Sequence, residues 1–180
     1  MTEHDKWIGK VVDHLNKLIQ LDFDTALTYK DALVHVDDLV VRLDLEDFLR
    51  DHERHVMELS SIIRDLGGTP IDVHRDIKGA LLEGVTRLRS RTGTLGALRA
   101  MRTNENLTNR VYDREMGVYM PPIAQVIVIE NQADERRHLA AIEAHIERLS
   151  VKVPAVGHVP VDREASERPR PTLVRHRTQE

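Results

Sequence analysis

The sequence predicts an all-α protein, an antiparallel four-helix bundle made of two related helical hairpins. Three observations favour this fold class. Apolar residues recur every three or four positions over several long segments. Aromatic residues make up only 3% of the chain, whereas strands rely on aromatic and β-branched side chains. A set of polar and aromatic positions also repeats at one fixed offset between the two halves of the chain.

The first hairpin is expected between residues 5 and 66. An apolar stripe from Ile8 to Leu33 predicts a first helix over residues 5–36. A second stripe predicts a helix over residues 44–66. It ends where the sequence Leu66-Gly67-Gly68-Thr69-Pro70 begins, because a left-handed Gly cap followed by Pro stops a helix.

The second hairpin is expected between residues 94 and 149, after a long crossover. Residues 73–91 predict a short connecting helix within that crossover. A third long helix is expected over residues 94–116 and ends before Gly117. The pair Pro121-Pro122 opens a fourth helix over residues 121–149, since Pro is tolerated in the first turn of a helix.

The chain divides into a bundle, residues 1–150, and a tail, residues 151–180. Four of the seven prolines lie in the tail, together with scattered charges and no helical period. Such a composition is typical of a disordered segment. We therefore expect one folded domain followed by a disordered Pro- and Arg-containing tail.

Composition excludes several classes of function. Cysteine is absent, so disulfide scaffolds and thiolate metal sites are excluded, and any metal must be bound by His and carboxylate side chains. The formal net charge of −4 lacks the basic excess of a nucleic-acid binder. Neither a signal peptide nor an apolar run long enough to span a membrane is present, which predicts a cytoplasmic protein.

The internal repeat places polar residues where a core is expected. An offset of 83 residues relates four pairs of positions: Asp22 and Glu105, Tyr29 and Tyr112, Asp51 and Asp134, and His55 and His138. The pairs predict two hairpins related by a pseudo-two-fold axis. Within each second helix of a hairpin, residues three apart project from one face, as His52 and His55 do.

Buried carboxylates cost several kcal/mol unless they are paired or bind a cation. Two divalent metals would compensate three carboxylates and three neutral imidazoles. The alternative is an internally paired polar layer without metal, in which the imidazoles are protonated. The predicted metal ligands are Asp22, His52, His55, Glu105, Glu135 and His138.

These motifs resemble the ferritin-like di-iron carboxylate superfamily, in which two helices each supply a carboxylate and two each supply Glu-x-x-His. The stretch from Leu15 to Asp22 is similar to the first helix of bacterioferritin. The segment Asp134-Glu135-Arg136-Arg137-His138 is similar to the Asp-Glu-x-Arg-His motif of di-iron oxidases. The segment Asp51-His52-Glu53-Arg54-His55, ahead of the Leu-Gly-Gly-x-Pro turn, resembles bacterial ferritin-like bundle proteins.

The resemblance implies roles for residues around the ligands. It pairs Asp134 with His55 and Asp51 with His138, so that each carboxylate fixes the tautomer of one imidazole. Tyr29 and Tyr112 are either core aromatics or hydrogen-bond donors to a ligating carboxylate. Arg54 and Arg137 are interpreted as surface charges, with an ion pair near the site as the less favoured alternative.

One position departs from the family pattern. His52 stands where the second helix normally presents a bridging Glu, and Glu53 cannot substitute because it points about 100° away around the helix. Asp22 is also one methylene shorter than the usual Glu. Imidazole is a competent ligand, so metal binding is expected to survive. The metals could then bind asymmetrically, or zinc or manganese could be preferred to iron.

The resemblance implies a site for two divalent metal ions, with iron the expected metal and zinc or manganese the alternatives. The expected function is reaction with oxygen or peroxide in iron handling or oxidative-stress defence, as a ferroxidase-like or other di-iron activity. The alternative is a non-catalytic bundle whose zinc or iron site is structural and which acts in assembly or stress response. Expected partners are metal ions and oxygen species, and a homo-oligomer is possible.

Overall fold

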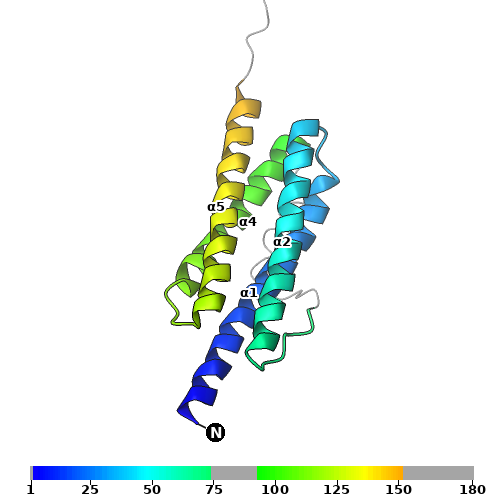
Figure 1. The fold of residues 1–180 in the computed structure, drawn as a ribbon. Helices are drawn as coiled ribbons and strands as arrows, with labels where there is room; N and C mark the ends of the chain where they lie inside the picture. The colour runs from blue at the N-terminus through cyan, green and yellow to red at the C-terminus, as the bar shows by residue number, and fades with distance from the viewer. Residues whose placement is uncertain (1, 74–92, 152–180) are drawn as a thin grey trace, which may run out of the picture.

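The computed structural model describes residues 2–73 and 93–151, which form four long helices and no strand (Figure 1). The helices are α1 (Glu3–Leu33), α2 (Leu39–Asp65), α4 (Thr94–Glu115) and α5 (Pro122–Ser150). The predicted all-α four-helix bundle is confirmed. The connecting helix is expected within residues 73–91 and the tail over residues 151–180. Apart from Val73 and Val151, both segments lie outside the described residues.

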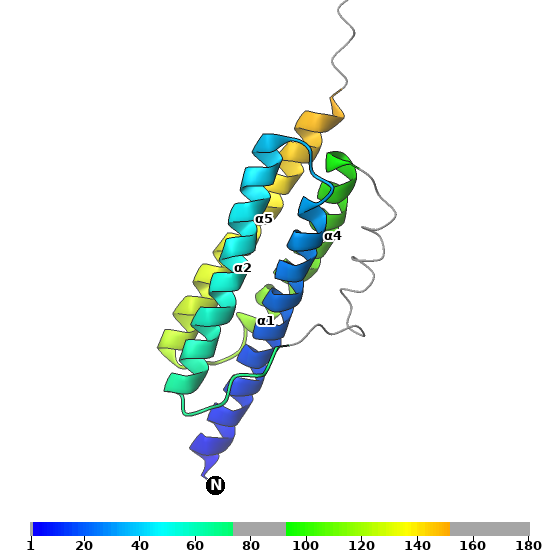
Figure 2. The same cartoon turned by 90° about the vertical axis from the view of Figure 1, so that its right-hand side faces the viewer.

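The helices pair as two hairpins that pack against each other. α1 packs along α2 and α4 along α5, while α1 also contacts α4 and α2 contacts α5. In both views α1 and α5 run in one direction and α2 and α4 in the other, so contacting helices are antiparallel (Figures 1 and 2). The amino end of α1 extends beyond the other three helices (Figure 2).

The helix boundaries follow from capping groups. Thr2 caps α1, with Asp5 completing the reciprocal capping box, and the helix ends at Leu33, three residues before the predicted end. α2 starts at Leu39, five residues before the predicted start. The side chain of Asp38 accepts a hydrogen bond from the backbone N–H of Val41 at 3.0 Å and so caps α2 there.

The turn after α2 has the predicted glycine geometry. Gly67 has a φ of 76°, in the left-handed region. The N–H of Gly68 donates to the carbonyl of Ile63 at 2.9 Å, which satisfies one of the last carbonyls of the helix. A Cβ on Gly68 would lie 2.6 Å from a methyl of Val12, so the close approach of this turn to α1 also requires glycine.

Two apolar clusters fill the bundle, one on each side of a polar layer. Along α1, Val11 to Ile19 belong to one cluster and Tyr29 and Ala32 to the other, with Asp22 between them. The same alternation occurs along the other three helices. The apolar clusters exclude water from both ends of the layer, which makes the centre of the bundle a low-dielectric site. Within the described residues, no helix is long and apolar enough to cross a membrane.

Candidate metal centre

All six predicted ligands meet in the polar layer, and each has 0% of its surface exposed. Their ligand atoms form two overlapping groups in which every atom lies within 4.8 Å of the others. The two groups share His52 and Glu135. One consists of Asp22, His52, His55 and Glu135, and the other of His52, Glu105, Glu135 and His138.

The helices α1 and α4 supply one carboxylate each, and a tyrosine from the opposite helix holds each one. The hydroxyl of Tyr29 donates to Glu105 at 2.5 Å, and the hydroxyl of Tyr112 donates to Asp22 at 2.6 Å. Both tyrosines are buried. Of the two roles left open by the sequence, the hydrogen-bonding one is therefore the one the structure has, and the hydroxyls fix the orientation of both carboxylates.

The helices α2 and α5 supply the histidines, and two of them, His55 and His138, each contact an aspartate of the opposite helix. Nε2 of His55 lies 3.4 Å from Asp134, and Nε2 of His138 lies 3.0 Å from Asp51. Both predicted contacts are present. They leave the Nδ1 atoms of the two rings directed to the interior of the cluster, where Nδ1 of His138 has no partner and Nδ1 of His55 lies 3.3 Å from Asp22. An Nε2–H on each ring would give Nδ1 the lone pair that a metal ligand needs once a cation replaces the Asp22 contact of His55.

Two arginines close the cluster on the α2/α5 side. Arg54 donates to Asp134 at 2.5 Å and Arg137 donates to Asp51 at 2.6 Å. The interpretation of these arginines as plain surface charges is wrong, because each one binds an aspartate that contacts a histidine of the cluster. Such charge-assisted bonds orient the aspartates, and through them the imidazoles.

His52 departs from the two-fold pattern of the ligands. Its Nδ1 lies 2.9 Å from Asp22 and 3.3 Å from Glu135, while its Nε2 lies 3.6 Å from Glu105. One ring thus faces carboxylates on both sides. Glu53 is half-exposed and pairs with Lys30 at 2.8 Å, so it does not replace the missing bridging carboxylate.

Several buried polar atoms of the cluster have no hydrogen-bond partner. They are Nε2 of His52, Oε2 of Glu105, both carboxylate oxygens of Glu135 and Nδ1 of His138. Glu135 is near His52 and His55, but without hydrogen-bond geometry. Unpartnered buried acceptors cost about 1–3 kcal/mol each, more when charged. Carboxylate oxygens and imidazole nitrogens that converge without partners fit a divalent cation.

Burial and neighbouring charges shift the titration of the cluster in opposite directions. Burial raises the pKa of Glu135 to about 8 and lowers the pKa of the His138 imidazole. For Asp22 the effect of burial is outweighed by hydrogen bonds from His52 and His55, which lower its pKa to about 2. For His55 burial is likewise outweighed, by Asp22 and Glu135, and its pKa rises to about 9.

The metal-free protein is expected to lose stability as the pH rises. The raised pKa of His55 contributes stability that is fully present below the unfolded value of 6.5 and is lost as the pH rises through about 9. Deprotonation of Glu135 through its pKa of about 8 acts with the same sign. Denaturant titrations in chelator should show the free energy of unfolding falling by about 3–5 kcal/mol from pH 6.5 to 9.5. A flat profile over that window would contradict the His55–Asp22 pair.

Loss of a tyrosine hydroxyl should weaken the bundle without unfolding it. Tyr112→Phe removes the donor to Asp22 and leaves a buried carboxylate oxygen less satisfied. We expect a loss of about 1–3 kcal/mol in the free energy of unfolding, measured by denaturant titration. Tyr119→Phe is the control, because Tyr119 is 78% exposed and should change stability by less than about 0.5 kcal/mol.

Other buried polar residues around the cluster were missed by sequence reasoning. The side-chain amide of Asn109 donates to the backbone carbonyls of both Glu105 and Glu135 at 2.9 Å, which ties α4 to α5 beside the ligands. Thr25 and Thr108 touch through their hydroxyls at 3.5 Å where α1 meets α4. The signal was available for the threonines, since they too are 83 residues apart; no local motif marks Asn109.

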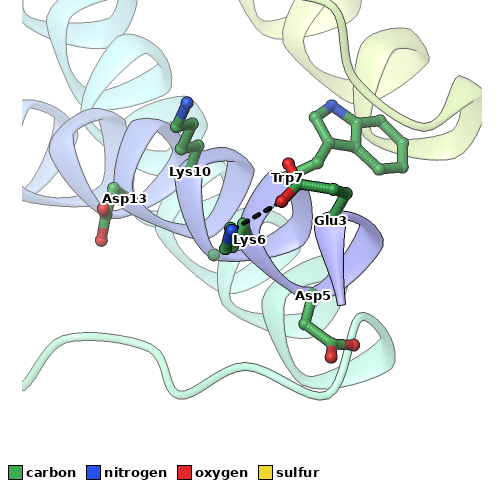
Figure 3. Close-up of a pocket in the computed structure, with 7 residues that line it drawn as sticks. Glu3, Asp5, Lys6, Trp7, Lys10 and Asp13 are labelled. Carbon is green, nitrogen blue, oxygen red and sulfur yellow. Dashed lines mark hydrogen bonds and ion pairs between the residues drawn. The ribbon is translucent and has the colours of Figure 1, made fainter. Parts of the chain in front are cut away.

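Two further histidines join helices outside the six-residue cluster. His145 contacts Asp44 at 2.6 Å and His14 contacts Glu115 at 2.6 Å, each joining two helices away from the six-residue cluster. A surface depression at the amino end of α1 includes Trp7 and the Lys6–Glu3 ion pair (Figure 3). It contains no residue of the cluster, so the buried layer is the better candidate for chemistry.

Comparisons with known proteins agree with this architecture. A ferritin-like domain in a two-domain protein from Anabaena variabilis, which also has a DJ-1/ThiJ/PfpI-like domain, matches 82% of this chain with a TM-score of 0.65 and 15% identity. This chain spans 40% of the length of that protein. A ferritin-like, diiron-carboxylate protein from Bacillus anthracis matches 83% of this chain and 96% of its own, with a TM-score of 0.51 and 19% identity.

The fold is therefore ferritin-like. No curated protein shows a significant match to the chain. A family model described as "Domain of unknown function (DUF2383)" matches residues 10–116, more than half of the chain. The matched segment includes most of α1 and all of α2 and α4, and thus four of the six clustered residues; Glu135 and His138 on α5 lie beyond it.

Proposed function

The chain belongs to the DUF2383 family, and we propose that its buried cluster binds two divalent metal ions, with iron as the metal. The observation that carries the proposal is the set of unpartnered oxygen and nitrogen atoms on Glu105, Glu135, His52 and His138. Burying oxygen and nitrogen atoms without partners in a dry layer is costly, and a cation would offset that cost. The diiron-carboxylate protein from Bacillus anthracis with the same fold supports iron.

The chain supplies the ligands and holds them in place. Glu135 belongs to both groups of donors and is therefore the shared carboxylate, while His55 and His138 each present Nδ1. Asp51 and Asp134 accept from the Nε2–H groups, so the imidazoles stay in the tautomer that binds metal. Tyr29 and Tyr112 orient the two carboxylates that α4 and α1 supply.

Iron bound at this site would supply the redox chemistry for reaction with oxygen or peroxide, and the role proposed for the chain is iron handling or oxidative-stress defence. The apolar clusters on both sides of the layer exclude bulk water from it. The protein contributes burial, ligand orientation and the carboxylate charge that stabilises a higher oxidation state.

A second candidate is a non-catalytic bundle with a structural zinc or iron site. His52 favours it, because a third imidazole in place of a bridging carboxylate removes one negative charge and one link between the metals. Zinc is well served by imidazole and carboxylate donors and has no redox chemistry. In this alternative, the metal stabilises the bundle and oxygen is not consumed.

Metal analysis separates the two candidates. Protein purified from iron-replete cells should contain iron, approach two ions per chain after anaerobic Fe²⁺ loading, and consume oxygen on exposure to air. Stoichiometric zinc with no oxygen uptake would support the structural site instead. Protein that binds neither metal, and whose unfolding is unchanged by chelator, would overturn both.

A further inference from the structure

The two groups of donors differ in how many of their oxygen and nitrogen atoms already have a hydrogen-bond partner. Every unpartnered atom among the six residues belongs to His52, Glu105, Glu135 or His138, which together are one of the two groups. The other group contains Asp22 and His55, and these two contact each other at 3.3 Å. One half of the cluster thus presents free lone pairs, whereas the other half is internally paired.

Asp22 is the most heavily engaged carboxylate of the cluster. Its Oδ1 accepts from Nδ1 of His52 at 2.9 Å and its Oδ2 accepts from the hydroxyl of Tyr112. Glu105, its counterpart 83 residues later, accepts from Tyr29 through Oε1, while its Oε2 has no partner. A cation that binds beside Asp22 must compete with these hydrogen bonds, and a cation beside Glu105 meets an open oxygen.

The orientation of the His52 ring determines which of the two groups has the open donor atoms. Nδ1 is directed to Asp22 as a hydrogen-bond donor, which leaves the lone pair of the ring on Nε2. Nε2 has no hydrogen-bond partner and faces Glu105. The ring therefore adds a donor to the group of Glu105 and His138, while it occupies an oxygen of the opposite group.

The number of available donor atoms also favours the group that contains Glu105 and His138. His52, Glu105, Glu135 and His138 offer two imidazoles and two carboxylates, which complete four-coordination of a divalent cation without any donor from Asp22 or His55. With Nδ1 of His52 retained by Asp22, the second group has three donors, and one of them is the shared Glu135. A cation that binds at the second position is also repelled by the positive charge of the first cation.

We propose that the cluster is two inequivalent sites filled in order, a complete four-donor site of His52, Glu105, Glu135 and His138 first and a weaker site beside Asp22 and His55 second. The proposal rests on the proposed function, since it concerns the same cluster. It makes His52 the residue that determines which half binds the first cation.

The test is a titration of chelator-treated full-length protein with Co²⁺, followed by calorimetry and by the visible absorption of the bound ion. The wild type should take up two equivalents in two resolved steps. The first step should be at least ~10-fold tighter, since changes in a ligand set and its hydrogen bonds alter affinity by roughly 10–100-fold. The first equivalent should also give the intense bands of a four-coordinate ion.

A matched pair of variants distinguishes the halves. His138→Asn should remove the first, tight step, whereas His55→Asn, its counterpart 83 residues earlier, should retain it and lose the second. Far-ultraviolet circular dichroism and thermal unfolding in chelator check that each variant folds. If His138→Asn does not fold, Glu105→Gln tests the same four-donor set with the same expected loss.

The outcomes separate this inference from the proposed function. Two equivalents taken up in one unresolved step, or a tight step that survives His138→Asn and is lost in His55→Asn, would overturn the ordered sites and leave metal binding intact. No Co²⁺ uptake by the wild type would overturn metal binding itself.

Discussion

Glu135→Gln is expected to abolish the binding of both metal ions. Glu135 is the one carboxylate that belongs to both groups of donors, and both of its oxygens lack a hydrogen-bond partner. An amide keeps the size of the side chain but removes its charge and one acceptor oxygen. We expect the affinity for Fe²⁺ or Zn²⁺ to fall by at least ~100-fold at each position, because changes to outer partners alone cost 10–100-fold.

The same substitution should leave the metal-free bundle folded. Burial already raises the pKa of Glu135 to about 8, so near pH 7 the metal-free protein largely carries a neutral side chain there. Unfolding in chelator should therefore be unchanged or slightly later. Glu143→Gln, on the exposed face of the same helix, is the control and should bind metal like the wild type. Retention of two metals by Glu135→Gln would refute the shared-carboxylate role.

The bundle and the meeting of the six side chains were predictable because the repeat carries them. A constant offset of 83 makes Tyr29–Glu105 and Tyr112–Asp22 reciprocal contacts, and the structure has both. The contacts of His55 and His138 with Asp134 and Asp51 are reciprocal in the same way. Because of the pseudo-two-fold axis, each contact inferred on one side of the cluster also predicts the matching contact on the other side. That the cluster binds metal stays a prediction.

Two features that the sequence did not reveal, the start of α2 and the role of Asn109, lack such a counterpart. The start of α2 depends on one aspartate cap, Asp38, and the run of β-branched residues after it gave a weak helix signal. Asn109 reaches backbone carbonyls on two helices, a contact set by packing and not by spacing. The pairing of Arg54 and Arg137 with opposite aspartates is different, because these arginines are themselves 83 residues apart and the repeat therefore contained a signal for their reciprocal contacts.

His52→Glu should destabilise the metal-free protein and stabilise the metal-loaded protein. The substitution introduces a fourth carboxylate among Asp22, Glu105 and Glu135, and it removes the imidazole that donates to Asp22. Without a cation, we expect the free energy of unfolding to fall by about 3–5 kcal/mol, the cost of an uncompensated buried charge. With Fe²⁺ or Mn²⁺ present, the additional carboxylate ligand should raise iron occupancy or the rate of iron oxidation.

Thermal unfolding with and without metal measures both effects on one sample. The gap between the metal-loaded and chelator-treated midpoints should be wider for His52→Glu than for the wild type, because tighter binding to the native state stabilises it further. His145→Glu is the matched control. It buries a carboxylate beside Asp44, outside the cluster, so it should destabilise the chain without recovery by metal. Equal gaps in all three proteins, with no change in iron occupancy or oxidation, would place residue 52 outside the coordination of the metals.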